Sequence, residues 1–188
     1  DPALGPALLA VARNAIADPL GLALEDEPFH AALADPGANF VTLKDAQGKL
    51  RGCIGNPEPT DALAQALRRH AHAAAFHDPR FDPLRAHECA GLALEVSLLS
   101  AGTPLPGAAT LHGAAATLRP GTHGVTRQWR GARATLLPQV WRQLPDPVEF
   151  LRVLCRKAGL PGGWHGGIEL AAFTVRSFTG PGPAARAA

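Results

Sequence analysis

The residues best suited to chemistry lie in segment 40–55, FVTLKDAQGKLRGCIG, where one cysteine stands between two glycines. The turn in this segment predicts a β-hairpin, and side chains alternate along each strand. Arg51, Cys53 and Gly55 should therefore share one face, while Gly52 points to the core. An arginine near a sulfur can stabilise the reactive thiolate, and glycines leave room for a ligand. The pattern fits a reactive cysteine, but it also fits a small hydrophobic residue of the strand.

Two histidines are candidates for moving a proton to or from this thiol. His77 ends a helix expected over about residues 61–77, where the helix dipole favours a charged imidazole, and His123 is the second candidate. His70 lies on the apolar stripe of the same helix, which is more typical of a packed or rim histidine. His70 and His72 point in different directions on a helix, so we expect no metal site.

One carboxylate stands out in the segment 92–99, where apolar and polar residues alternate. The alternation predicts a central strand with Glu95 on its polar face. A buried carboxylate needs a cation, and we expect Arg51 to supply it. Such a pair would leave this arginine less available to activate Cys53.

Composition excludes several classes of protein. The chain has 188 residues, 46% of them hydrophobic, and a net charge of +2, with basic residues scattered along it, so neither a nucleic-acid nor a membrane partner is expected. Cys53, Cys89 and Cys155 are odd in number and far apart, which argues against a disulfide framework and favours a reducing cytoplasm. No leader-like or membrane-spanning apolar run occurs. Serine-hydrolase, P-loop and dinucleotide motifs do not occur, and we expect no cofactor.

These residues must be positioned by alternating helical and extended segments. Apolar spacing, turn residues and caps predict helices, hairpins and strands in a fixed order. The order is a helix from residue 4 to 16, the hairpin 40–55, a helix over 61–77, a strand 92–99, a linker 101–110, a short helix 111–118, a hairpin of 123–129 with 132–137, a helix from Asp146 to Gly159 and a strand 168–178. This order favours an α+β fold with a mainly antiparallel or mixed sheet and flanking helices over a doubly wound fold.

Several short blocks in one order resemble the AMMECR domain family. The blocks are LRGCIG at 50–55, AFHDPRF at 75–81, EVS at 95–97, LLPQV at 136–140, and KAGL at 157–160 with Trp164. The resemblance covers almost the whole chain. It implies a single α+β domain over 4–178 with two unequal lobes, and the tail 179–188 is expected to be disordered.

The resemblance also implies a site, although no settled activity comes with the family. The family's LRGCIG motif is suspected of lining a functional cleft. The residues expected to bind a ligand there are Arg51, Gly52, Gly55, Glu95, His123 and Gln139. The family includes protein A of the AmmeMemoRadiSam system, so the expected partners are a Memo-like protein, related to class III extradiol dioxygenases, and a radical SAM protein. The sequence departs from the family at 124–129, where an aliphatic strand is usual, and at 165–167, where acidic or polar residues are commoner.

Two functions stay open from the residues. In the first, Cys53 is a nucleophile or thiol carrier, Arg51 stabilises its anion, and His77 or His123 moves the proton. In the second, a non-catalytic cleft binds a small ligand or the chain end of a partner, and Arg51 binds a negative group of that ligand or partner. Because no base is visibly tied to the thiol by sequence, we favour recognition. The oligomeric state is not predicted.

Overall fold

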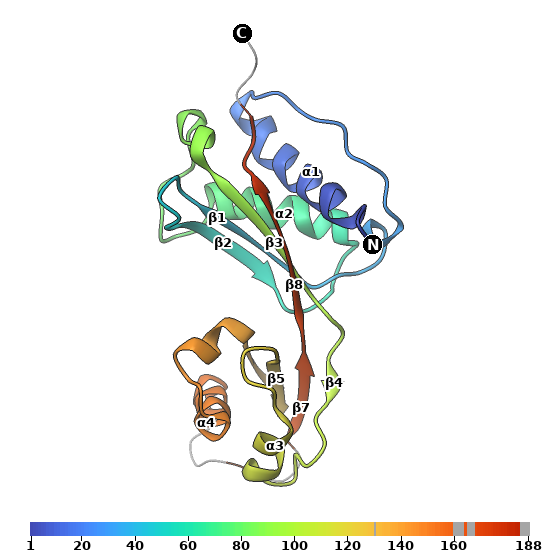
Figure 1. Ribbon diagram of the computed structural model, residues 1–188, viewed down its shortest axis with the longest axis vertical. Helices are drawn as coiled ribbons and strands as arrows, with labels where there is room; N and C mark the ends of the chain where they lie inside the picture. The colour runs from blue at the N-terminus through green and yellow to red at the C-terminus, as the bar shows by residue number, and fades with distance from the viewer. Residues whose placement is uncertain (130, 160–163, 165–167, 185–188) are drawn as a thin grey trace. The chain divides into compact units, whose positions relative to one another are not determined.

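The computed structural model of the chain describes residues 1–129, 131–159, 164 and 168–184 (Figure 1). These residues divide into two compact units. Unit 1 contains residues 1–99 together with the described residues from 176 to 184, and unit 2 contains the described residues between 100 and 175. Each unit is built on one four-stranded sheet flanked by helices, so the predicted α+β class is confirmed.

Unit 1 holds a sheet with the strand order β2-β1-β3-β8. Its elements are α1 (Leu4–Ala17), β1 (Asn39–Lys44), β2 (Leu50–Asn56), α2 (Leu63–Phe76), β3 (Ala93–Leu99) and β8 (Val175–Pro181), with the short 3-10 helices η1 (Asp18–Leu20), η2 (Ala31–Leu33) and η3 (Ala86–Gly91). β1 pairs antiparallel with both β2 and β3. The predicted hairpin is confirmed, with Gly48 at a positive φ of 76° in its turn. β3 is an inner strand, as expected, and β2 is an edge.

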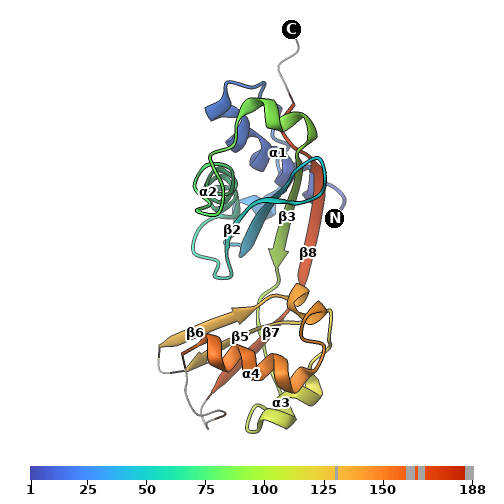
Figure 2. The same cartoon turned by 90° about the vertical axis from the view of Figure 1, so that its left-hand side faces the viewer.

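The two faces of this sheet differ in chemistry. In Figure 2, α1 and α2 both lie on one face, and the side chains of Val41, Leu43, Leu94 and Val96 pack there with no exposed surface. The strand residues between them point to the opposite face. We call this opposite face the polar face of sheet 1 and define it by Thr42, Lys44, Cys53, Glu95, Ser97 and Ser177.

Unit 2 is also built on a four-stranded sheet with helices. Its elements are β4 (Thr103–Pro104), α3 (Leu111–Thr117), β5 (Gly124–Trp129), β6 (Ala132–Leu136), the 3-10 helix η4 (Pro138–Arg142), α4 (Pro147–Lys157) and β7 (Glu169–Phe173), and the strand order is β4-β7-β5-β6. Asp146 caps α4 by accepting the N–H of Glu149, as the sequence predicts. The core contains Trp141 stacked on Phe150 with ring centroids 3.9 Å apart.

Three boundaries differ from the sequence prediction. The expected strand 168–178 is two strands, β7 and β8, which join different sheets on either side of Thr174. The tail is predicted to begin at residue 179, but β8 continues to Pro181, and Gly182 then donates its N–H to the carbonyl oxygen of Leu92. The linker 101–110 contains the short strand β4. In each case the backbone pairing is long-range, which local composition does not encode.

Helix α2 approaches β2 so closely that only glycine fits beneath it. A Cβ at Gly52 would lie 2.1 Å from the carbonyl oxygen of Ala74, whereas a Cβ at Gly48 would meet nothing within 4 Å. The absence of a side chain at residue 52 therefore serves the packing of the helix on the sheet.

This contact yields the first prediction. Gly52→Ala should destabilise the protein by about 2–4 kcal/mol, since the helix must move away from the sheet. Gly48→Ala is the matched control, and its cost should be about 1 kcal/mol from the positive φ alone. Urea unfolding followed by circular dichroism measures both. Equal losses in the two variants would show that the close approach is not a constraint.

Candidate functional site

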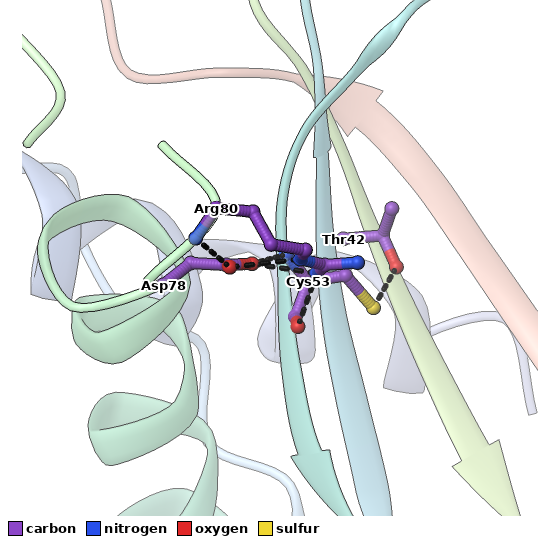
Figure 3. Close-up of polar contacts among 4 residues, drawn as sticks. All are labelled: Thr42, Cys53, Asp78 and Arg80. Atoms are coloured by element: carbon purple, nitrogen blue, oxygen red, sulfur yellow. Dashed lines mark hydrogen bonds and ion pairs between the residues drawn. The ribbon is translucent and has the colours of Figure 1, made fainter. Parts of the chain in front are cut away.

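The side chain of Cys53 lies on the polar face of sheet 1 and is partly exposed. Thr42 is its partner across the hairpin, and the Thr42 hydroxyl donates a hydrogen bond to the sulfur at 3.3 Å. Figure 3 shows the Thr42 oxygen and the Cys53 sulfur beside each other, on the side of the strands away from α2. The sulfur thus has a polar, part-open environment, unlike the buried thiols of Cys89 and Cys155, whose pKa values burial raises.

The backbone of Cys53 is held from outside the sheet by the loop that follows α2. Its N–H donates to Asp78 Oδ2 at 2.9 Å, and its carbonyl accepts from Arg80 Nη2 at 3.2 Å. Both groups point away from β1, at the free edge of β2 (Figure 3). The loop therefore takes the place of a further strand and satisfies an otherwise open edge.

Asp78 and Arg80 pair with each other, and we call these two residues and their contacts with the Cys53 backbone the clamp. Asp78 is 4% exposed and accepts from both the backbone N–H and the guanidinium of Arg80, with Nη2–Oδ2 at 2.6 Å. Arg80 above all, and then the Cys53 N–H, hold the pKa of the Asp78 carboxyl well below its ordinary value against the opposing effect of burial. About half of the Arg80 side chain stays exposed, and its guanidinium lies 5.5 Å from the centre of the Phe81 ring.

The predicted pairing of Arg51 with Glu95 is wrong. Arg51 makes a two-pronged ion pair with Glu88, with Nε–Oε1 at 2.7 Å and Nη2–Oε2 at 3.1 Å. The cause is local, because η3 brings Glu88 to the edge strand and the carboxylate also accepts the N–H of Arg85. The pair raises the pKa of Arg51 and lowers that of Glu88. Arg80, and not Arg51, is the guanidinium that contacts Cys53.

Glu95 takes its cation from the neighbouring strand. Its carboxylate accepts from Lys44 Nζ at 3.1 Å and from the hydroxyls of Ser97 and Ser177 at 3.3 and 3.2 Å. Burial alone would raise the pKa of Glu95, but Lys44 and the two serines outweigh it and leave the pKa lowered. Glu95 lies opposite Thr42 in the register, so this cluster continues the row that starts at Cys53.

His77, the C-cap residue of α2, and His70, inside the helix, have different surroundings. His77 ends the helix as predicted and is exposed, with its ring 5.2 Å from that of His72. No contact among the described residues links its ring to Cys53. His70 is a packed histidine, 6% exposed, whose Nδ1 lies 2.9 Å from Asn39 Oδ1. Burial lowers the pKa of His70, so the neutral ring is favoured.

Both glycines of the motif have a packing reason. Gly52 lies under α2, and a Cβ at Gly55 would come within 2.4 Å of the Phe40 ring and 2.3 Å of the Asn39 carbonyl oxygen. The space beside each glycine is filled by the protein itself. The glycines therefore do not by themselves indicate a ligand, and their role in binding stays a prediction.

His123 and Gln139 belong to unit 2 and are described there. His123 lines a hollow of about 480 Å³ together with Thr117 and Thr174. The Nε of Arg119 donates to its Nε2 at 3.1 Å, and burial followed by the charge of Arg119 lowers its pKa. Gln139 is exposed on η4. A role for either residue beside Cys53 stays a prediction.

Comparison with known sequences decides the family. A sequence profile described as AMMECR1 matches residues 9–178. The chain belongs to the AMMECR1 family.

Other members of the AMMECR1 family resemble the chain over most of its length. A protein of Aeropyrum pernix is 39% identical over 172 residues, which cover 86% of this chain and 71% of that protein. Protein MK0488 of Methanopyrus kandleri is 39% identical over 170 residues, covering 85% and 79% of the two chains. The crystal structure of the uncharacterized protein PH0010 from Pyrococcus horikoshii is similar with a TM-score of 0.75 and 33% identity, and the match covers 95% of this chain and 92% of that one. These names carry no activity.

Two further observations on the described residues concern membranes and metals. None of the described helices has both the length and the apolar character needed to cross a bilayer. The described part of the chain contains no cluster of three or more His, Cys, Asp or Glu side chains able to hold a metal ion.

Sequence reasoning missed three residues that shape this AMMECR1-family site, namely Thr42, Asp78 and Arg80. Thr42 could have been found from the hairpin register, which places it opposite Cys53. Asp78 and Arg80 lie in the block AFHDPRF at 75–81, which from the sequence alone indicates only the family resemblance. An acid and a base two residues apart, next to an edge strand, are a signal of such a clamp.

The buried Asp78 carboxylate leads to a prediction on acid stability. Its pKa is depressed in the folded state, so it stabilises the fold above the unfolded value of about 3.9, and this contribution is lost as the pH falls. Asp78→Asn should cost about 2–4 kcal/mol near pH 7, and the difference from the natural protein should shrink below about pH 4. Urea unfolding at several pH values measures it.

Asp61→Asn is the matched control, because Asp61 also pairs with an arginine, Arg69, but at the surface. Its effect should be much smaller, since solvent screens the pair. A loss at Asp78 that does not change with pH would contradict a role for its charge.

Proposed function

We propose that this AMMECR1-family protein is a non-catalytic recognition domain, and that the polar face of sheet 1 around Cys53 receives a segment of a partner protein. The proposal rests on the environment of the Cys53 sulfur. Its one described hydrogen-bond partner is the Thr42 hydroxyl, and the backbone on both sides of the sulfur is locked by Asp78 and Arg80. A rigid thiol without a base fits recognition better than nucleophilic catalysis.

The chemistry of the face supports the same proposal. Its hydroxyls, the Glu95 carboxylate and the Lys44 ammonium already contact one another, so they are held in place before any partner arrives. Preorganised polar groups lower the entropy lost on binding. The half-exposed Arg80, rather than Arg51, is the guanidinium available to a negative group of the partner.

We further propose that the partner is the Memo-like protein or the radical SAM protein of a three-protein system, as the family resemblance implies. All three proteins would then act in the cytoplasm. In support, the cysteines Cys53, Cys89 and Cys155 are all free thiols, which suits a reducing compartment.

Thiol chemistry at Cys53 is the second candidate, and one observation favours it. Of the three cysteines only Cys53 is partly exposed, and a hydroxyl donates to its sulfur. In this version Cys53 is the nucleophile of a modification subunit and a partner supplies the base.

Blocking the polar face tests recognition directly. Ser97→Tyr places a bulky ring on this face, and it should weaken binding of the purified Memo-like or radical SAM protein at least about tenfold, or 1.4 kcal/mol. Gln65→Tyr is the matched control, because Gln65 is exposed on α2, which covers the other face of sheet 1. Calorimetric titration of each variant with each partner measures the effect. If the natural protein binds neither partner, or both variants bind equally well, the proposal fails.

Alkylation tests the role of the sulfur. A maleimide should label the native protein at Cys53 well before the buried Cys89 and Cys155, as peptide mass spectrometry would show. A bulky maleimide should then abolish partner binding, and Cys53→Ser treated with the same reagent controls for labelling elsewhere. Retained binding after complete labelling of Cys53 would place the partner away from this face. Transfer of a group from a partner to the sulfur would instead support the thiol chemistry.

A further inference from the structure

Unit 2 contains a fully buried guanidinium. Arg127 lies on β5 and has no exposed surface. None of the described residues accepts a hydrogen bond from its Nε, Nη1 or Nη2 atoms. An arginine stays protonated in proteins, so its charge must be balanced where it lies. This residue falls in the strand where the sequence departs from the aliphatic pattern of the family.

The carboxylates of unit 2 do not balance it. Residues 100–175 contain eight Lys or Arg residues and only three acidic ones. Asp146 caps α4, and Glu149 pairs with Arg152 and Arg156 at the surface. Glu169 is exposed and lies in register with Gln128, so its side chain points to the opposite face of the sheet from Arg127.

The thiol of Cys155 does not balance it either. Arg127 acts to lower the pKa of this thiol, but burial outweighs the arginine and leaves the pKa raised. The thiol is therefore neutral near neutral pH, and no charge among the described residues of unit 2 compensates the guanidinium. A buried charge without a counter-charge is costly, and proteins avoid it unless a partner is bound.

We propose that Arg127 is the recognition residue of an anion-binding site inside unit 2, which takes an oxyanion such as a carboxylate or a phosphoryl group. A guanidinium offers five N–H donors in a planar fork that matches both groups. Its strand neighbours in the register are Ala134 and Leu170. Their side chains carry no polar group, so neither of them competes with the anion for the guanidinium. Because Arg127 is covered, the anion enters through a local opening of the unit.

The three tryptophans give an experiment that reports on this unit alone. Trp129, Trp141 and Trp164 all lie between residues 100 and 175. Urea unfolding of the full chain is followed by tryptophan fluorescence in sodium chloride, sodium acetate and sodium phosphate at equal ionic strength. The midpoint for the natural protein should rise in phosphate, in acetate, or in both, and the stronger response identifies the preferred group.

Arg127→Met is the test variant and Arg133→Met the control. Arg133 lies on the adjacent strand β6, is exposed, and faces the other side of the sheet from Arg127. In chloride, Arg127→Met should have a higher midpoint than the natural protein, since it removes an unbalanced buried charge. It should also lose the specific anion response, while Arg133→Met keeps it. General salting effects act on all three proteins alike.

Two results would overturn the proposal. One is that phosphate and acetate raise the unfolding midpoint of Arg127→Met as much as they raise that of the natural protein. The other result needs no folded Arg127→Met. It is that calorimetric titration of the natural protein with phosphate and with acetate detects binding of neither ion. Binding of either ion there, with the response retained in Arg133→Met, supports the site.

Discussion

The approach of α2 to β2 at Gly52 is the contact on which the site in unit 1 depends. The Ala74 carbonyl oxygen lies 2.1 Å from the position that a Cβ of residue 52 would take, and Asp78 follows shortly after the end of α2. At this separation the loop after α2 reaches the backbone of Cys53 at the sheet edge. The missing side chain at residue 52 thus allows the close packing of α2 from which the loop with Asp78 and Arg80 extends to Cys53.

The features that could be predicted from the sequence are those that local signals encode. Periodicity and turn residues encode the hairpin, α2 and β3, because these signals are local, and the structure confirms them. The ion pairs were not predictable in the same way. Arg51 binds Glu88, 37 residues away, and Glu95 binds Lys44, 51 residues away, and both choices depend on how distant segments are brought together.

The split of the last strand shows the same limit. Composition between 168 and 178 is uniformly compatible with an extended chain, yet β7 and β8 belong to different sheets. Which sheet a strand joins is decided by partners such as Ser97, whose hydroxyl contacts Ser177, and these lie far away in sequence. The glycines lie on the hairpin as predicted, and the structure adds a packing reason for both of them.

The arginines of the chain differ in how their charge is balanced. In unit 1, Arg51 and Arg80 are each matched by a carboxylate, Glu88 and Asp78, and both carboxyls have lowered pKa values because of that match. Arg127 in unit 2 is more deeply buried than either and has no such match among the described residues. The same physical requirement that fixes the clamp around Cys53 therefore calls for an anion from outside the described chain at Arg127.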